Sequence, residues 1–278
     1  MADDYRQASL DIWDQMAAAW DDDRRWVWES SRPVGEWLVD ALDPQEGETI
    51  LELAAGVGDT GIAAAGRLGS SGKLISSDFS PQMVDAARRR AEELGATGVE
   101  FRTMDAERMD LPDDSVDGVV CRGGYMLMAE PAAALRETRR VLRPGGRLAL
   151  SVWGDPEANR WASVPARVLA EHTGAPPPDP LAPGIFAMAS ERRTRELLGE
   201  AGFEPRRVEH VDMEWAFEKP DDHWHYVMDH AGALAMKIRS LPEPDHAAIR
   251  RVTEERLEPV ARRPGYGLPG RCLNVLAE

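Results

Sequence analysis

The sequence predicts an α/β fold: a mostly parallel seven-stranded sheet with helices on both faces, an antiparallel last strand and a helical cap. Two observations carry this prediction. Strand and helix patterns alternate between residues 48 and 153 at the pace of βαβ units, which pair their strands in parallel. A strand at 271–277 then follows two helices and has no helix after it. We therefore expect it to pair antiparallel with residues 208–217.

Local signals mark the individual elements along the chain. Ser80 can cap a helix that has Pro81 at its first position, and Gly95 suits the position just past the end of that helix. The turn sequence at 143–146 leads into a strand at 147–153. The other expected strands are 73–77, 99–104 and 115–122, and the other expected helices are 59–68, 130–142, 191–201, 221–240 and 245–260.

The chain divides into four expected regions. They are an N-terminal helical lid segment (1–46), a nucleotide-binding core with a connector insertion at 155–190 (47–218), a helical cap insertion (219–264) and a final strand that completes the core sheet (265–278). The first region contains a helix at 11–20 with the apolar stripe Trp13, Met16, Ala17 and Trp20. This stripe predicts a helix that packs on the main domain, covers a ligand cleft as a lid, or does both.

Composition limits the classes of partner. The 278 residues carry a formal net charge of −16, and the sequence pI is about 4.9. Nucleic-acid binding depends on basic side chains that neutralise phosphates, so we expect no nucleic-acid partner. The acidic N-terminus and the lack of a long apolar run predict a cytoplasmic protein without an integral membrane segment. Cys121 and Cys272 are too few for a disulfide framework or a cysteine-based metal site, and we expect no metal.

A glycine-rich turn at residues 50–61, ILELAAGVGDTG, is the most informative segment of the chain. It reads as a buried strand that runs directly into a turn and then into a helix. Gly56 and Gly58 permit positive φ angles and leave no side chain between the backbone and a ligand. The N-terminus of the next helix presents free N–H groups. Such a turn is typical of sites that bind nucleotide-like ligands.

Acidic residues end the two strands that follow this turn. Asp78 stands 22 residues after Gly56, where nucleotide-binding folds place the carboxylate that accepts the ribose hydroxyls. Asp105, followed by Ala106, ends the third strand. Because the carboxyl ends of parallel strands meet at one edge of a sheet, we expect both acids to face the same ligand.

These residues resemble the motifs of class I S-adenosylmethionine-dependent methyltransferases, over roughly residues 48–217. The resemblance implies a Rossmann-like fold, S-adenosylmethionine as cofactor and S-adenosylhomocysteine as product. The run at 116–154 is similar to small-molecule members, including the C-methyltransferases of menaquinone and ubiquinone synthesis. The expected activity is transfer of a methyl group to a small, largely apolar or aromatic acceptor by in-line displacement, in a protein that is a monomer or homodimer.

The resemblance also implies which residues hold the cofactor. The first motif reads from Glu52 to Gly58, with Ala54 in place of the family's first glycine, and Asp78 matches the ribose-binding acid. Phe79 and Met83 are expected to flank the adenine, and Asp105 with Ala106 to meet its polar edge. The full expected set is Glu52, Ala54, Gly56, Gly58, Asp78, Phe79, Met83, Asp105, Ala106, Cys121 and Arg122.

Two other functions fit parts of the pattern. Gly56, Gly58 and Gly61 satisfy the G-x-G-x-x-G pattern of NAD(P)-binding oxidoreductases. Against this reading, the fifth strand leads into a proline-rich connector and not into a second mononucleotide-binding half, and the carboxylates of Glu52 and Asp105 would repel a pyrophosphate. A non-catalytic, S-adenosylmethionine-binding regulatory protein is the other alternative.

Candidate substrate residues lie near the expected ligand edge or in the cap. They are Trp20, Tyr125, Trp153 and His223. For Tyr125, filling a gap beneath the cap is as good a reading as substrate contact. His223 is a weak candidate for a general base, since a neutral imidazole could remove a proton during methyl transfer. The alternative is that it is a surface histidine of the cap helix.

Overall fold

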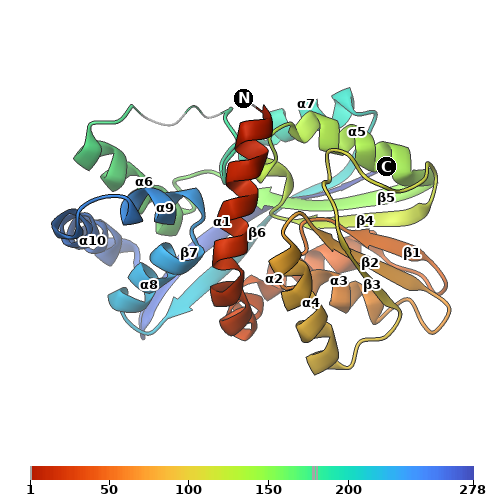
Figure 1. Ribbon diagram of the computed structural model, residues 1–278, viewed down its shortest axis with the longest axis horizontal. Helices are drawn as coiled ribbons and strands as arrows, with labels where there is room; N and C mark the ends of the chain where they lie inside the picture. Colours follow the sequence, from red (N-terminus) through yellow and green to blue (C-terminus); the bar gives the residue numbers. More distant parts are fainter. Residues whose placement is uncertain (1, 177–178, 180) are drawn as a thin grey trace.

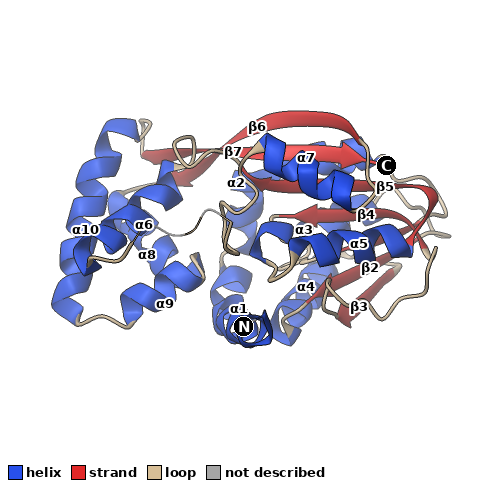
Figure 2. Ribbon diagram, turned by 90° about the horizontal axis from the view of Figure 1, so that it is seen from above, coloured by secondary structure: helices blue, strands red, loops and turns tan. Residues whose placement is uncertain are grey.

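A computed structural model describes residues 2–176, 179 and 181–278 (Figures 1 and 2). The strands are β1 (Thr49–Glu52), β2 (Lys73–Asp78), β3 (Val99–Thr103), β4 (Val116–Arg122), β5 (Leu142–Trp153), β6 (Pro205–Phe217) and β7 (Tyr266–Ala277). The helices are α1 (Ala2–Asp22), α2 (Arg24–Leu42), α3 (Asp59–Ala65), α4 (Pro81–Leu94), α5 (Pro131–Val141), α6 (Arg160–Thr173), α7 (Glu191–Glu200), α8 (Pro220–His230), α9 (Ala233–Arg239) and α10 (Glu243–Leu257). Single 3₁₀ turns lie at Tyr125–Leu127 and Glu258–Val260.

The seven strands form one sheet in the order β3-β2-β1-β4-β5-β7-β6. The strands from β3 to β5 pair in parallel. Strand β7 runs antiparallel to both of its neighbours: Ala277 lies opposite Leu148 of β5, and Tyr266 lies opposite Phe217 of β6. The expected α/β fold with its antiparallel last strand is therefore confirmed. The parallel pairing also places the carboxyl ends of β1, β2, β3 and β4 at one edge of the sheet.

Two apolar clusters fill the two faces of the sheet. One contains Leu51 and the inward sides of α5 and α7, such as Leu135 and Leu197. The other contains Ile50 and side chains of α2 and α6, such as Leu38 and Val164. The neighbours Ile50 and Leu51 enter opposite clusters because successive strand residues point to opposite faces. A strand that is buried on both faces reads as a continuous apolar run.

The cap gathers at one end of the molecule and contains more helix than the sequence suggested (Figure 2). Helix α6 packs against α10, and α8 lies against α9 and β6. We expected residues 155–190 to form a connector insertion, whereas they include the fourteen-residue helix α6. Pro165 lies within that helix and obscured the helical pattern of its apolar residues. Trp161, Val164 and Val168 recur at helical spacing on the buried side of α6.

The N-terminal region is a pair of helices. Helix α1 is longer than the expected 11–20, and it runs between α4 of the core and α8 and α9 of the cap (Figure 1). The backbone N–H of Gly232 donates to the Met16 sulfur at 3.1 Å, which ties α1 to the cap. On the core side, the Tyr5 hydroxyl donates to the carbonyl of Leu127 at 2.9 Å. Helix α2 was not expected, because Pro33 and several charged residues interrupt its pattern.

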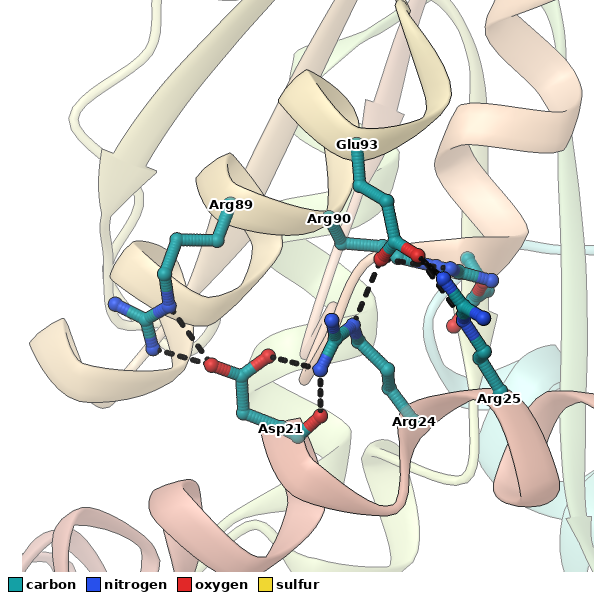
Figure 3. Close-up of polar contacts among 7 residues, drawn as sticks. Asp21, Arg24, Arg25, Arg89, Arg90 and Glu93 are labelled. Carbon is teal, nitrogen blue, oxygen red and sulfur yellow. Dashed lines mark hydrogen bonds and ion pairs between the residues drawn. The ribbon is translucent and has the colours of Figure 1, made fainter.

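A network of charged side chains fixes the α1–α2 junction on α4 (Figure 3). Asp21 accepts from Arg89 at 2.7 Å, and Glu93 accepts from Arg24 at 2.9 Å and from Arg90 at 3.1 Å. Hydrogen bonds from Arg25, Arg24 and Arg90 lower the pKa of Glu93 to about 2. The network anchors the C-terminal end of α1 to α4, the helix that follows β2.

None of the helices in the described part of the chain combines the length and the apolar character needed to cross a membrane.

Candidate functional site

The glycine-rich turn joins β1 to α3 and contains three residues with positive φ: Ala54 at 51°, Gly56 at 56° and Gly58 at 84°. A Cβ atom added to Gly58 would lie 3.0 Å from the Cβ of Ala87, so this glycine allows the turn to pack on α4. A Cβ atom added to Gly56 would meet no atom within 4 Å. The backbone at Gly56 therefore borders open space at the carboxyl edge of the sheet.

Asp78 ends β2 beside this open space. Its carboxylate accepts one hydrogen bond from the N–H of Gly56 and one from the N–H of Ser80, each at 2.9 Å. Burial raises the pKa of Asp78, and the backbone donors oppose that rise. Since each carboxylate oxygen has a second lone pair, Asp78 can hold the turn and still accept hydrogen bonds from a ligand.

Glu52 lies deeper and binds the protein itself. The side chain is 3% exposed, and its two oxygens accept from the N–H of Gly61 at 2.6 Å and from the Ser76 hydroxyl at 2.8 Å. Burial raises the pKa of Glu52 to about 8. Because Gly61 belongs to the first turn of α3, Glu52 positions the helix that follows the glycine-rich turn.

The end of β3 is covered by α1. Asp105 is half-buried, and its carboxylate accepts from the N–H of Glu107 at 2.9 Å. Arg6 of α1 pairs with Glu107, and its Nε lies 4.0 Å from the other oxygen of Asp105. Ala106 is buried beside these residues. The N-terminal helix thus lies over the acid that we expect to meet the adenine.

Two residues expected to flank the adenine lie at the start of α4. Phe79 is half-buried, and Met83 is buried with its N–H bonded to the Ser80 hydroxyl. The same hydroxyl donates to Asp14 of α1. Helix α1 therefore contacts the ends of both β2 and β3.

Cys121 and Tyr125 lie in the core next to the site. Both are fully buried in the cluster that contains α5. The Tyr125 hydroxyl lies 2.6 Å from that of Thr138, and burial raises the pKa of the Cys121 thiol to about 12. Both side chains pack in the core, and the contacts expected for them with cofactor or acceptor stay predictions. Cys121 points to the α5 face because its neighbours in the strand alternate in direction.

Arg122, the next residue, points to the opposite face. Its Nε donates to the Thr60 hydroxyl at 3.0 Å, and its Nη1 donates to the Ser31 hydroxyl at 3.1 Å. Thr60 belongs to the first turn of α3 and Ser31 to α2. Arg122 is therefore held at the carboxyl end of β4, next to the glycine-rich turn.

Aromatic side chains form a continuous cluster between this edge and the cap. Its ring contacts include Trp153 with Trp161 at 4.8 Å and Trp215 with Tyr226 at 4.8 Å between centroids. Trp20 contacts the cluster through His230. The sequence pointed to Trp20 and Trp153 but not to Trp215 or Tyr226. The alternating buried residues at the end of β6 were the signal that could have found Trp215.

His223 is buried in this cluster. The side chain is 1% exposed, its Nε2–H donates to the carbonyl of Trp161 at 2.8 Å, and its ring contacts Phe217. Burial lowers the pKa of His223 to about 4. The alternative that it is a surface histidine is wrong. Its contacts fit a neutral residue that ties α8 to α6.

Two hollows in the described part of the chain lie away from this edge. Each has a volume of about 250 Å³, and both touch Glu157 and Arg160.

Comparison with known proteins shows what this part of the chain is similar to. Residues 44–173 match the family model described as "Methyltransferase domain". The segment that holds the glycine-rich turn, Asp78 and Asp105 therefore resembles a methyltransferase domain. An arsenite methyltransferase of Halobacterium salinarum is 31% identical over 171 residues, covering 62% of this chain and 41% of that protein. A demethylmenaquinone methyltransferase of Clavibacter sepedonicus is 39% identical over 116 residues, covering 42% and 45%. The chain thus spans less than half the length of these curated relatives.

Solved structures show the fold of the methyltransferase domain together with its cap. A Bacillus halodurans C-125 protein assigned as a methyltransferase superposes with a TM-score of 0.59 at 21% identity, covering 87% of this chain and 97% of that one. Geranyl diphosphate C-methyltransferase of Streptomyces coelicolor A3(2), crystallised with S-adenosyl-L-homocysteine, gives a TM-score of 0.51 at 17% identity, covering 90% and 79%. The expected resemblance to S-adenosylmethionine-dependent methyltransferases is confirmed. After β5 the sheet of the domain ends in an antiparallel pair, so the second half of a dinucleotide fold does not follow.

The residues of the methyltransferase domain fit its cofactor, S-adenosylmethionine. Open space borders Gly56, and Asp78 reaches the same space with free lone pairs. The charge of the edge also fits, because the carboxylates of Asp78, Asp105 and Asp14 favour a ligand that carries a sulfonium and an ammonium group.

Ala54 adopts a backbone conformation that suits glycine, with φ at 51°. We expect Ala54→Gly to raise the free energy of unfolding by roughly 0.5–1 kcal/mol. The left-handed conformation costs alanine about 1–2 kcal/mol, and part of this gain is lost to the greater chain entropy of glycine. Urea denaturation measures the change. Ala55→Gly is the matched control, because Ala55 has no positive φ and its replacement should destabilise; equal effects of the two changes would contradict the argument.

Proposed function

We propose that this protein transfers a methyl group from S-adenosylmethionine to a small, largely apolar or aromatic acceptor. The observation that carries the proposal is the open space at Gly56, which Asp78 borders at the carboxyl edge of a methyltransferase domain. The bound cofactor supplies an electrophilic methyl group, whose bond to sulfur breaks as the acceptor forms its own bond to that carbon. The protein contributes binding, alignment and exclusion of water.

In this proposal the cofactor lies along the ends of four strands. Asp78 accepts the ribose hydroxyls, while Phe79 and Met83 contact the adenine ring. Asp105 and the backbone at Ala106 bind the polar edge of the adenine. The remaining cofactor residues belong to the first motif and to β4: Glu52, Ala54, Gly56, Gly58 and Arg122. Of these, Glu52 acts by positioning Gly61, since both of its oxygens are already engaged.

The acceptor would lie between this edge and the cap. Trp153, Trp161, Trp215 and Tyr226 provide the apolar walls on that side, which supports an aromatic or otherwise apolar molecule. Helix α1 packs on α4 of the core and on α8 and α9 of the cap, so it borders the region between them.

Replacement of Asp78 by alanine tests the cofactor site. We expect Asp78→Ala to weaken binding of S-adenosylhomocysteine by about 1.5–3 kcal/mol, because the ribose loses hydrogen bonds to an ionised acceptor. This corresponds to roughly 10- to 150-fold in Kd. Isothermal titration calorimetry measures the change. Asp85→Ala is the matched control, since Asp85 is an exposed acid of α4 paired with Arg88. Unchanged affinity of Asp78→Ala would mean that the ligand is a different one.

A ligand panel tests the function itself. Thermal unfolding in the presence of S-adenosylmethionine, S-adenosylhomocysteine, NAD or NADP reports which of them binds the native state. A ligand at a hundred times its Kd adds about 2.7 kcal/mol, which corresponds to several degrees. We expect a rise with the two sulfur compounds alone, and a rise with a nicotinamide cofactor instead would overturn the proposal. Binding is then followed by turnover assays that detect S-adenosylhomocysteine with aromatic and quinone acceptors.

A further inference from the structure

Arg122 is a half-buried cation without an anionic partner. Its guanidinium donates hydrogen bonds to the buried, uncharged hydroxyls of Thr60 and Ser31. Within the described ranges, no carboxylate oxygen lies within 4 Å of its guanidinium, whereas Arg90 nearby is paired with Asp59. A charge removed from water is costly unless an opposite charge compensates it. An anion supplied by a ligand could therefore compensate the charge of Arg122.

The acids nearest to Arg122 are committed elsewhere. The charge of Arg122 acts on both Glu52 and Asp59. Glu52 accepts from Gly61 and Ser76, and Asp59 accepts from Arg90 at 2.8 Å. Neither acid makes a direct contact with the guanidinium. They attract it without neutralising it at hydrogen-bonding distance.

Helix α2, which accepts from Arg122 at Ser31, also meets the aromatic cluster. The ring centroid of Trp26 in this helix lies 5.6 Å from that of Tyr226, and Tyr226 in turn contacts Trp215 at 4.8 Å. Arg122 is therefore joined through α2 to the cluster between the cofactor edge and the cap.

We propose that Arg122 binds a carboxylate at the carboxyl end of β4. This inference rests on the proposed function, because it assigns part of the same site. The carboxylate has two possible sources: the amino-acid end of the cofactor, and an acidic acceptor whose apolar part lies against the aromatic cluster.

The geometry of the guanidinium favours a carboxylate over a phosphate. With Nε and one Nη1 hydrogen engaged, the second Nη1 hydrogen and both Nη2 hydrogens remain for a planar, two-point contact. A phosphate dianion would leave one of its two charges without a counter-charge at this single cation.

Two matched ligand pairs separate the sources. S-adenosylhomocysteine and 5′-methylthioadenosine share the nucleoside and differ in the amino-acid end. With the cofactor site occupied, 3-phenylpropanoate and 3-phenylpropanamide share a shape and differ in charge. Their affinities are measured by quenching of tryptophan fluorescence in the wild type, Arg122→Met and Arg32→Met. Arg32, an exposed residue of α2, is the control for loss of one positive charge.

We expect Arg122→Met to weaken one charged member by tenfold or more while its uncharged counterpart changes less than twofold. Loss confined to S-adenosylhomocysteine assigns the carboxylate to the cofactor, and loss confined to phenylpropanoate assigns it to the acceptor. Arg122→Lys, which keeps the charge, should retain part of the preference and serves if the methionine variant does not fold. For each ligand pair, the ratio of the affinity for the charged member to that for the uncharged member is compared with the wild type. If Arg122→Met and Arg122→Lys both leave these two ratios within twofold of the wild-type values, the proposal is overturned.

If the wild type binds no sulfur nucleoside, the proposed function is refuted, and the carboxylate subsite at Arg122 is tested separately. In that case the acid and the amide are compared without cofactor, and equal affinity for both also refutes the carboxylate subsite.

Discussion

Replacement of Arg90 by methionine is expected to lower the free energy of unfolding by about 3–5 kcal/mol, because it leaves a buried carboxylate without its counter-charge. Arg90 and Asp59 are 5% and 4% exposed, and the guanidinium contacts one oxygen of Asp59 at 2.8 Å. The other oxygen of Asp59 is buried and has no hydrogen-bond partner among the described residues. Burial already raises the pKa of Asp59 in spite of Arg90. Loss of the arginine removes the main interaction that opposes this rise.

A double variant separates the loss of the pair from the loss of packing. Arg90→Met with Asp59→Leu replaces both charges by apolar groups, and such exchanges are often neutral. We expect the double variant to recover a large part of the stability in urea denaturation. A single variant within 1 kcal/mol of the wild type, where breaking a buried pair typically costs several times more, would contradict the burial of the pair.

Glu52→Ala is expected to lower the free energy of unfolding by about 2–5 kcal/mol, because it leaves the N–H of Gly61 and the hydroxyl of Ser76 buried without a partner. A Cβ atom added to Gly61 would lie 2.2 Å from the Glu52 carboxyl group, which shows how closely α3 packs on it. Glu52→Gln is the matched variant, since its amide can still accept from Gly61 and donate to Ser76. It should lose much less stability than Glu52→Ala.

The two Glu52 variants also predict a pH dependence. Burial raises the pKa of Glu52 from 4.5 to about 8, so the folded protein holds this proton more tightly than the unfolded chain does. The contribution of Glu52 to stability is then fully present below pH 4.5 and is lost as the pH rises to 8. Urea denaturation at several pH values in this window should show the wild type losing stability relative to Glu52→Gln. Parallel pH profiles of the two proteins would be inconsistent with a raised pKa.

Local patterns in the sequence were sufficient for the core of the fold and for one half of the site. The strand, glycine turn and helix around Gly56 depend on neighbouring residues, and so does the cap of α4 at Ser80. The separation of Gly56 and Asp78 is set by a single βα unit, and the two residues are joined by a hydrogen bond of 2.9 Å. For this reason the expected meeting of turn and acid could be predicted.

The rest of the site depends on contacts between distant parts of the chain. The direction of each side chain at the end of β4 differs between Cys121, which enters the core, and Arg122, which donates to Thr60 of α3 and Ser31 of α2. The burial of His223 results from the packing of α8 on α6, a helix whose pattern is interrupted by Pro165. The position of α1 is fixed by residues such as Met16 and Gly232, which are 216 residues apart. Composition and spacing do not encode such partners.

The place of β7 in the sheet has a consequence for synthesis of the protein on the ribosome. In the part of the chain that the structure describes, strand β6 pairs only with β7, which joins it to β5. While a nascent chain still lacks Tyr266–Ala277, its parallel strands can already assemble. Strand β5 then presents an open edge and β6 has no partner, so both are exposed to chaperones and to pairing with other chains. The twelve residues of β7 close both edges together and add a link between the cap and the core.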